Sequence, residues 1–274
     1  MPLPAENLPE LVEDYPLTSE QIESYRRDGF ILLRGVASEE EVAAYRPLIE
    51  EAVYENARRK EPQKIDDYSE IFIQVTNLWL KSEAVRRFVF ARRFAKIAAE
   101  LMGVSGVRLY HDQALFKPPG GKQTPWHQDQ VYWPLSTEHT ITMWMPLVDA
   151  PREIGTMTFA AGSHREGQLG SLIISDEAQR FFERLIAERG FPLVSYDLRA
   201  GDATFHAGYV LHCAQANRSD RVREVMTIIY YADGARIMEP DNDYRRVDME
   251  GFHPGQRPGE VAASPLNPLL YQAA

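Results

Sequence analysis

The sequence predicts a fold of the α+β, mainly β class: one domain in which a jelly-roll core carries N-terminal helices packed on one side. Short β-type segments alternate with Pro- and Gly-containing turns over about residues 106–233, as in β-sandwiches and barrels. Residues 1–105 are rich in helix signals instead, and residues 234–274 hold enough Pro and Gly to predict an irregular tail. A chain of 274 residues is long enough to bury a substantial core, so we expect a single domain over 1–274.

Capping signals and hydrophobic period locate the helices of the first part. Thr18 and Ser38 each stand three residues before a Gln or Glu, in TSEQ and SEEE, which is the capping-box pattern of a helix start. The second of these helices is expected over about 39–59. Residues 82–103 have helical periodicity and stop at Gly103, a residue typical of helix C-caps. The other expected elements are a strand at 29–36, a strand leading into a loop at 70–79 and a helix at 176–190.

The segment VRLYHDQALFK, residues 107–117, carries polar residues on both faces of its expected strand. Strict alternation places His111, Gln113 and Lys117 on one face, with Leu109 among them, and Tyr110 on the other. Such a strand fits a barrel whose interior holds a polar ligand. It fits an edge strand with one wet face equally well.

Charge and composition exclude several classes of partner. The net charge is −10 and the pI about 5.3, whereas a nucleic-acid site needs a basic face. No apolar run approaches the ~20 residues of a membrane span. The acidic, proline-bearing N-terminus predicts no secretory signal, which makes the cytoplasm the expected compartment. Cys213 is the only cysteine, so an internal disulfide and thiolate metal clusters are excluded. The sequence does not reveal the oligomeric state.

The stretch PWHQDQVYWP, residues 125–134, combines metal-ligand chemistry with large rings. His127 and Asp129 leave the same face of the chain if the stretch is extended. A non-haem Fe(II) centre of the two-His, one-carboxylate type would need one further His. His212, at the end of an apolar strand-like run, is the candidate, and His206 is its nearest rival. An isolated H-x-D also suits hydrogen-bonded surface residues, and His212 also suits a satisfied core position.

Further side chains around these histidines have two interpretations. Arg223 follows His212 by eleven residues; it suits either a bidentate carboxylate site or a surface ion pair. Trp126, Tyr132 and Trp133 suit either the walls of a pocket or ordinary core. Several polar residues suit either substrate contacts or structural roles: Asn77, His111, Gln128, Arg152 and Tyr209.

Four motifs in order resemble the phytanoyl-CoA dioxygenase family of Fe(II)/2-oxoglutarate oxygenases. They are LFKPPGGKQTPWHQDQVYWPL, MWMPLVDA, GTMTFAAGSHREG and GDATFHAGYVLHCAQANRSDRVR, and the resemblance runs from about Gly29 to Asp233. It implies a jelly-roll core of the cupin-like, double-stranded β-helix type. The motifs are specific to the family as a whole and not to one substrate.

The resemblance also implies roles for individual residues. His127, Asp129 and His212 match the iron ligands, and Arg223 matches the partner of the distal carboxylate of 2-oxoglutarate. Trp144, Gln113 and Gln74 match further positions that contact this cosubstrate in the family. Lys117 is a fourth candidate, because alternation along its strand places it on the same face as Gln113. One departure is Ala214, where the family often has a Ser that contacts 2-oxoglutarate.

What the resemblance implies chemically is hydroxylation of a small molecule. Fe(II), 2-oxoglutarate and O2 would together produce succinate, CO2 and an oxidised substrate. Related halogenases replace the carboxylate ligand with a small residue, so the presence of Asp129 favours hydroxylation. Desaturation, cyclisation or epimerisation at the same site remains open, as does a non-catalytic cupin-like protein that binds metal or 2-oxoglutarate. Substrates within the family's reach include acyl-CoA, amino acids, osmolytes, phosphonates and secondary metabolites.

Overall fold

The computed structural model describes residues 7–59, 72–170 and 172–273. Its α-helices are α1 (Ser19–Asp28), α2 (Glu39–Arg59), α3 (Glu83–Val89), α4 (Arg92–Met102), α5 (Asp176–Arg189) and α6 (Asp243–Phe252). Its strands are β1 (Phe30–Leu33), β2 (Ile73–Thr76), β3 (Gly106–Phe116), β4 (Thr124–His127), β5 (Thr140–Pro146), β6 (Met157–Ala160), β7 (Leu193–Ser195), β8 (Ala203–Ala207), β9 (His212–Ala214), β10 (Val225–Ala232) and β11 (Leu269–Gln272). Four short 3-10 helices join them: η2 (Leu78–Leu80), η3 (Asp129–Val131), η4 (Arg152–Ile154) and η5 (Ser163–Glu166).

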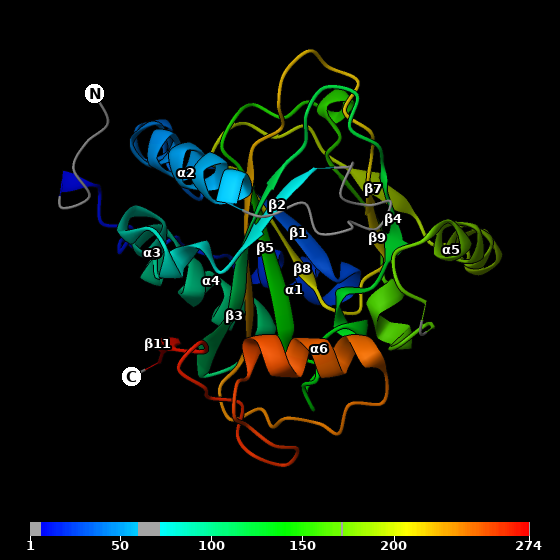
Figure 1. Ribbon diagram of the computed structural model, residues 1–274. Helices are drawn as coiled ribbons and strands as arrows, with labels where there is room; N and C mark the ends of the chain where they lie inside the picture. Colours follow the sequence, from blue (N-terminus) through cyan, green and yellow to red (C-terminus); the bar gives the residue numbers. More distant parts are fainter. Residues whose placement is uncertain (1–6, 60–71, 171, 274) are drawn as a thin grey trace.

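Two antiparallel sheets form the centre of this mixed α/β fold. The large sheet has the order β1-β8-β5-β10-β3-β11, with β2 also paired to β3, and the small sheet has the order β4-β9-β6-β7. Figure 1 shows α2, α3 and α4 together on one side of the molecule, and α5 on the opposite side beside the small sheet. The largest hydrophobic cluster joins these N-terminal helices to the large sheet, and a separate one joins α5 to the small sheet. Each sheet therefore buries its outer face under helices, which leaves the inner faces to form a site.

The helix starts predicted from the sequence are confirmed, and one predicted helix is divided. Thr18 and Gln21 form the capping box of α1, and Ser38 exchanges the same two hydrogen bonds with Glu41 at the start of α2. Gly103 ends α4 in the left-handed conformation, at φ 71°. The expected helix over 82–103 is instead two helices, α3 and α4. The backbone leaves helical geometry at Phe90 and Ala91, and the two helices bury apolar side chains in the same core cluster.

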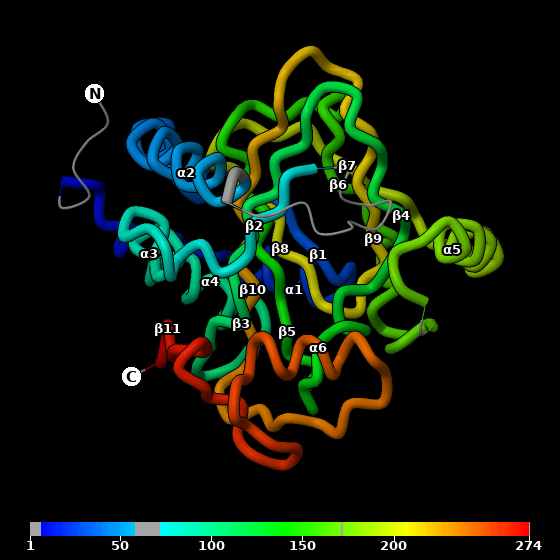
Figure 2. Tube along the Cα trace, viewed as in Figure 1, coloured from blue at the N-terminus to red at the C-terminus, as the bar shows by residue number. Residues whose placement is uncertain are grey.

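The C-terminal tail has more regular structure than the sequence predicted. Where an irregular segment was expected, α6 begins after Asn242, whose side chain accepts a hydrogen bond from the backbone N–H of Arg245. β11 then pairs with the first residues of β3. In the tube view of Figure 2, α6 crosses the front of the molecule below β3 and β5. Short polar segments of this kind give a weak sequence signal, because their order comes from docking on the sheet.

A β-bulge in β3 overturns the strict alternation expected for this strand. His111 lies opposite Ile229 of β10, whereas Leu109 already lies opposite Tyr230, so the pairing gains a residue at Tyr110. Leu109 consequently belongs to the helix-side core, while Tyr110 and His111 lie near each other, with ring centroids 5.0 Å apart. Bulges often re-aim side chains beside functional sites, and this one directs both rings toward the space between the sheets.

No helix in the described part of the chain is long and apolar enough to cross a membrane.

Candidate metal and cosubstrate site

A cavity of about 370 Å³ lies between the two sheets. Its walls come from both sheets, from the turn after β4 and from α6. Its lining includes metal-ligand side chains, one buried arginine, aromatic rings and smaller polar and apolar groups. Among the lining residues are His111, Gln113, His127, Asp129, Tyr132, Trp133, Thr142, Trp144, His206, His212, Ala214, Arg223, Asp248 and Phe252.

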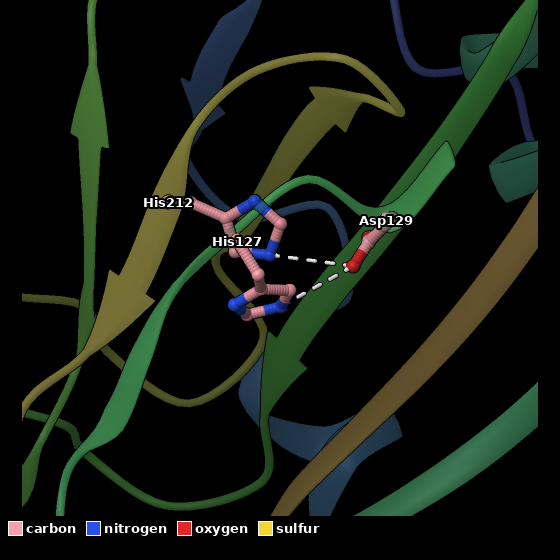
Figure 3. A group of neighbouring side chains, drawn as sticks. All are labelled: His127, Asp129 and His212. Atoms are coloured by element: carbon pink, nitrogen blue, oxygen red, sulfur yellow. Dashed lines mark ion pairs between the residues drawn. The ribbon is translucent and has the colours of Figure 1, made fainter. Parts of the chain in front are cut away.

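Local strand geometry brings His127, Asp129 and His212 to one point. His127 ends β4 and lies directly across from His212, the first residue of β9, so the two rings are cross-strand neighbours with centroids 4.2 Å apart. Gln128 is extended, at φ −117° and ψ 130°, which returns Asp129 to the side of His127. Ligand atoms of all three residues lie within 4.8 Å of one another. Figure 3 shows both imidazoles facing the Asp129 carboxylate.

Backbone carbonyls select the tautomer of both imidazoles. Nδ1 of His127 lies 2.7 Å from the Pro125 carbonyl oxygen, and Nδ1 of His212 lies 3.0 Å from that of Val210. A carbonyl oxygen only accepts, so Nδ1 carries the proton and Nε2 is left as a lone pair. The two Nε2 atoms lie 3.4 and 3.5 Å from Oδ1 of Asp129. Three acceptors around one point are the complement of a cation.

The second oxygen of Asp129 is held by different partners. Oδ2 accepts a hydrogen bond from the Thr142 hydroxyl at 3.1 Å and lies 3.3 Å from Nε2 of His206. Burial by itself would raise the pKa of this carboxyl, but the surrounding histidines hold the pKa well below its usual range. Burial, aided by His212, lowers the pKa of His127, so that imidazole is neutral at pH 7. The site thus places the Asp129 carboxylate beside the neutral imidazole of His127.

Arg223 is a buried cation without an anionic partner among the described residues. It is 1% exposed, its Nη1 donates to the Gly155 carbonyl oxygen, and its Nε has no partner. Burial is the one influence that shifts its pKa, to about 9, so it remains charged at neutral pH. Its guanidinium lies 5.5 Å from the Trp144 ring. A charge left alone at this depth is costly, which indicates that an anionic ligand completes the site.

Comparison with known proteins agrees with this combination of a metal-ligand triad and a buried arginine. The sequence profile of the phytanoyl-CoA dioxygenase (PhyH) family matches residues 25–225, most of the chain. The chain belongs to the phytanoyl-CoA dioxygenase family. Its motifs, quoted above from the sequence, all lie within or at the edge of this match.

Three similar proteins show the range of activities around the family. An ectoine dioxygenase of Bordetella bronchiseptica is 30% identical over 156 residues, or 55% of this chain, and the match spans about half of that relative's length, 50%. The solved structure of SnoK, a non-heme alpha-ketoglutarate-dependent carbocyclase from nogalamycin biosynthesis, has a TM-score of 0.76 and 28% identity, covering 98% of this chain and 99% of SnoK. The epimerase SnoN, in complex with Fe3+, alpha ketoglutarate and nogalamycin RO, has a TM-score of 0.73 and 29% identity, covering 92% and 97%.

The other positions suggested by the family motifs divide into two groups. Gln74, Gln113 and Trp144 line the cavity. Lys117 does not lie on its wall: β3 ends at Phe116, and Nζ of Lys117 instead donates to the Gln215 carbonyl oxygen behind Arg223. Burial, with the nearby Arg223 charge, lowers the pKa of Lys117 to about 6. Gln74 and Gln113 therefore line the cavity as expected, whereas the expectation that Lys117 faces the cavity is wrong.

Two further family-related positions are small and apolar. Ala214, the one departure noted from the resembled motif, lines the cavity, and its methyl group offers no hydrogen-bond donor there. Cys213 faces away, in the cluster under α5, and burial raises the pKa of its thiol to about 12. A thiol that stays protonated is a packing residue and not a metal ligand or redox group.

The aromatic and polar candidates near the triad also have defined places. Tyr132 and Trp133 line the cavity, but Trp126 packs with α5 on the outer side of the small sheet. Gln128 is structural: its amide donates to the carbonyl oxygens of Gly167 and Tyr209. Among the polar candidates, His111 lines the cavity, whereas Asn77, Gln128, Arg152 and Tyr209 are not among its lining residues.

Sequence reasoning missed several contributors to the cavity, among them Thr142, Asp248 and Phe252. Thr142 has a weak but readable signal, because it alternates with Trp144 on β5 and so shares its face. Asp248 and Phe252 come from α6 in the tail that was expected to be irregular. No local pattern connects them to the triad, of which His127 and Asp129 lie more than a hundred residues earlier, so their place in the cavity follows only from the tertiary structure.

Proposed function

We propose that this chain is a non-haem Fe(II)- and 2-oxoglutarate-dependent oxygenase that oxidises a small molecule. The proposal rests on one observation: a single cavity is lined by two groups that suit ligands of opposite charge. Three converging acceptors suit a metal cation, and the buried Arg223 suits a carboxylate. We further infer that its two antiparallel sheets form the cupin-like jelly-roll core of a single domain.

In this proposal the chain's own residues hold, orient and isolate the reactants. Nε2 of His127, Nε2 of His212 and Oδ1 of Asp129 bind Fe(II), while the carbonyl oxygens of Pro125 and Val210 keep the imidazoles in the metal-binding tautomer. Arg223 pairs with the distal carboxylate of 2-oxoglutarate, and Gln74, Gln113 and Trp144 line its path. Bound iron supplies the oxidation, in which 2-oxoglutarate and O2 become succinate and CO2 as the substrate is oxidised.

Hydroxylation is the first reaction outcome, because Asp129 is available as a ligand. A second outcome has a specific observation in its favour: SnoK and SnoN, at 28% and 29% identity over most of both chains, are named as a carbocyclase and an epimerase. Product mass separates the outcomes. Hydroxylation adds one oxygen, and ring closure or desaturation removes two hydrogens and releases water. Epimerisation leaves the mass unchanged and needs an added two-electron reductant for each turnover.

The test of the cofactor chemistry is an anaerobic titration of Fe(II) into the metal-free protein with 2-oxoglutarate present. We expect a weak visible charge-transfer band of the chelated cosubstrate in the natural protein. We expect no band in His212→Ala, and a band that needs more 2-oxoglutarate in Arg223→Met. The matched control is Arg221→Met, an exposed arginine two residues away, which should behave as the natural protein does.

Three outcomes decide between this proposal and its rivals. A band under anaerobic conditions, followed by slow succinate release when O2 is admitted, supports the oxygenase. Metal binding without the band or succinate release would instead favour a non-catalytic metal-binding protein. Absence of metal binding would contradict the proposal altogether.

A further inference from the structure

The outer end of the cavity is chemically distinct from the triad and Arg223. Its walls are His111 on the β3 bulge, Tyr132 and Trp133 on the turn after Asp129, and Asp248 and Phe252 on α6. The proposed cofactor and cosubstrate use none of these side chains. They line the part of the cavity that α6 closes, and they are therefore the candidates for contact with a substrate.

Asp248 supplies a carboxylate that has no basic partner among the described residues. Oδ2 accepts a hydrogen bond from the buried Tyr110 hydroxyl at 2.8 Å. Burial raises the pKa of Asp248 to about 7, the Tyr110 bond opposes this rise, and no cationic side chain acts on it. An acidic group that lines a cavity and lacks a counter-charge is the complement of a cationic ligand.

His111 supplies an independent observation at the same end. It is 3% exposed and lines the cavity, yet its Nδ1 is buried with no hydrogen-bond partner among the described residues. Burial lowers the pKa of His111 to about 3, so the ring is neutral and can donate from one nitrogen and accept at the other. Its ring rests on Phe252, with centroids 4.3 Å apart. A buried polar group is rarely left unpaired, so a ligand is the natural partner.

The rings around these two groups define the shape of what binds there. Tyr132, Trp133 and Phe252 present aromatic surface beside the Asp248 carboxylate. Aromatic faces attract cations as well as flat apolar groups. The Tyr132 hydroxyl accepts a hydrogen bond from the Ile174 backbone N–H. Burial raises the pKa of Tyr132 to about 12, and the charges of Asp129 and Asp248 both add to this rise. Tyr132 therefore lies between the triad and the acidic outer end.

We propose that the outer end binds a substrate that joins a protonated amine to a flat, largely apolar body, with Asp248 pairing to the ammonium group and His111 hydrogen-bonded to a polar group on the body. The reaction at the triad rests on the proposed function above, whereas the binding preference does not. Arg223 and the metal take the anionic cosubstrate at the inner end, and Asp248 selects the opposite charge at the outer end. Such a division keeps substrate and cosubstrate from exchanging places.

The experiment compares two probes of nearly equal shape, 2-naphthylmethylamine and 2-naphthalenemethanol. At neutral pH the first is a cation and the second is neutral. Calorimetry measures their affinities for the full chain under anaerobic conditions, with Fe(II) and 2-oxoglutarate present. A repeat without metal excludes direct ligation of iron by the amine. The variants are Asp248→Asn, Tyr110→Phe and, as a charge-matched control on the exposed face of α6, Asp243→Asn.

We expect the natural protein to bind the amine about tenfold or more tightly than the alcohol. Asp248→Asn should bring the two affinities together, because the amide keeps the shape and loses the charge. Tyr110→Phe should keep the preference, since it removes the Tyr110–Asp248 bond and leaves the carboxylate, and Asp243→Asn should keep it too. His111→Phe should lower the affinity for both probes only slightly, because the naphthalene body of each probe lacks the polar group assigned to His111. This loss should be much smaller than the loss of amine affinity in Asp248→Asn.

Equal affinities in the natural protein, or a preference that survives in Asp248→Asn, would overturn the inference. So would a failure of the amine to bind, or loss of the preference in Tyr110→Phe alone, which would make Asp248 a structural tie for α6. The visible band of the Fe(II)–2-oxoglutarate complex is recorded in the same samples. A normal band without amine preference rejects this inference and leaves the proposed function standing; an absent band rejects the proposed function whatever the probes do.

Discussion

The inner and outer ends of the cavity differ in how the chain builds them. At the inner end, His127 and His212 face each other across one strand pair, and Asp129 follows His127 after a single extended residue. At the outer end, His111 depends on a bulge in β3, and Asp248 on a helix near the C-terminus. Regular pairing of β4 with β9 therefore assembles the inner end, whereas a bulge and the docking of α6 assemble the outer end. The same fold can keep the residues of the inner end constant while the residues of the outer end vary.

The largest expected effect is a loss of cosubstrate affinity at the inner end. Arg223→Met removes the buried cation, so we expect the affinity for 2-oxoglutarate to fall about 100-fold or more. The same change should raise the melting temperature of the protein without cosubstrate, because a buried guanidinium with no carboxylate partner is replaced by an apolar side chain. Binding assays and thermal unfolding, each with and without 2-oxoglutarate, measure both effects. A loss of stability without cosubstrate would show that Arg223 is a structural residue.

A smaller effect sharpens the description of the inner end. Thr142→Val keeps the shape of the side chain and removes the hydroxyl that holds Oδ2 of Asp129. We expect the affinity for Fe(II) to fall about 10-fold, within the range seen when outer partners of a metal ligand are lost. Chelator competition measures it, and Thr142→Ser should restore most of the loss. Equal affinity in Thr142→Val would mean that His206 alone positions the carboxylate.

The third prediction concerns pH and the group behind Arg223. The pKa of Lys117 is about 6 in the folded chain and near its ordinary value when unfolded, so the unfolded state binds more protons between about pH 6 and 10.5. Stability therefore rises with pH across that window, by at most about 1.4 kcal/mol per pH unit from this group. Lys117→Met should flatten this rise in urea unfolding measured at several pH values. An unchanged slope would mean that Lys117 remains charged when folded.

The smallest expected effect is confined to the outer end. Asn242→Ala removes the cap of α6 and should cost about 1 kcal/mol of local stability. Hydrogen exchange should accelerate in α6 and remain unchanged in β9, and the Fe(II)–2-oxoglutarate band should be unaffected. Weakened amine binding in this variant would agree with α6 as the wall that holds Asp248. Slower binding of Fe(II) in this variant would show that α6 also affects the inner end, and would contradict the expectation that α6 acts on the outer end alone.

Several local features could be predicted because nearby residues determine them. The capping boxes at Thr18 and Ser38 depend on side chains three residues apart, and Gly103 ends α4 because it adopts a positive φ at little cost. The pairing of His127 with Asp129 on one face needed only an extended Gln128. The four family-like motifs, which lie between residues 115 and 223, predicted Trp144, His212 and Arg223 for the inner end.

Tertiary structure decided what no local pattern contained. It divided the expected helix over 82–103, turned Tyr110 and His111 to the same side of β3, and moved Lys117 off the cavity wall. It also ordered α6 and brought Asp248 to a tyrosine 138 positions earlier in the chain.

The sequence alone thus indicated the class of chemistry, because four motifs in order resemble those of one oxygenase family, whereas His127 and Asp129 by themselves also suit hydrogen-bonded surface residues. Only the tertiary structure decided the shape and charge of the outer cavity. Its walls come from segments that meet through packing, and the energy of packing depends on surfaces assembled across the whole chain.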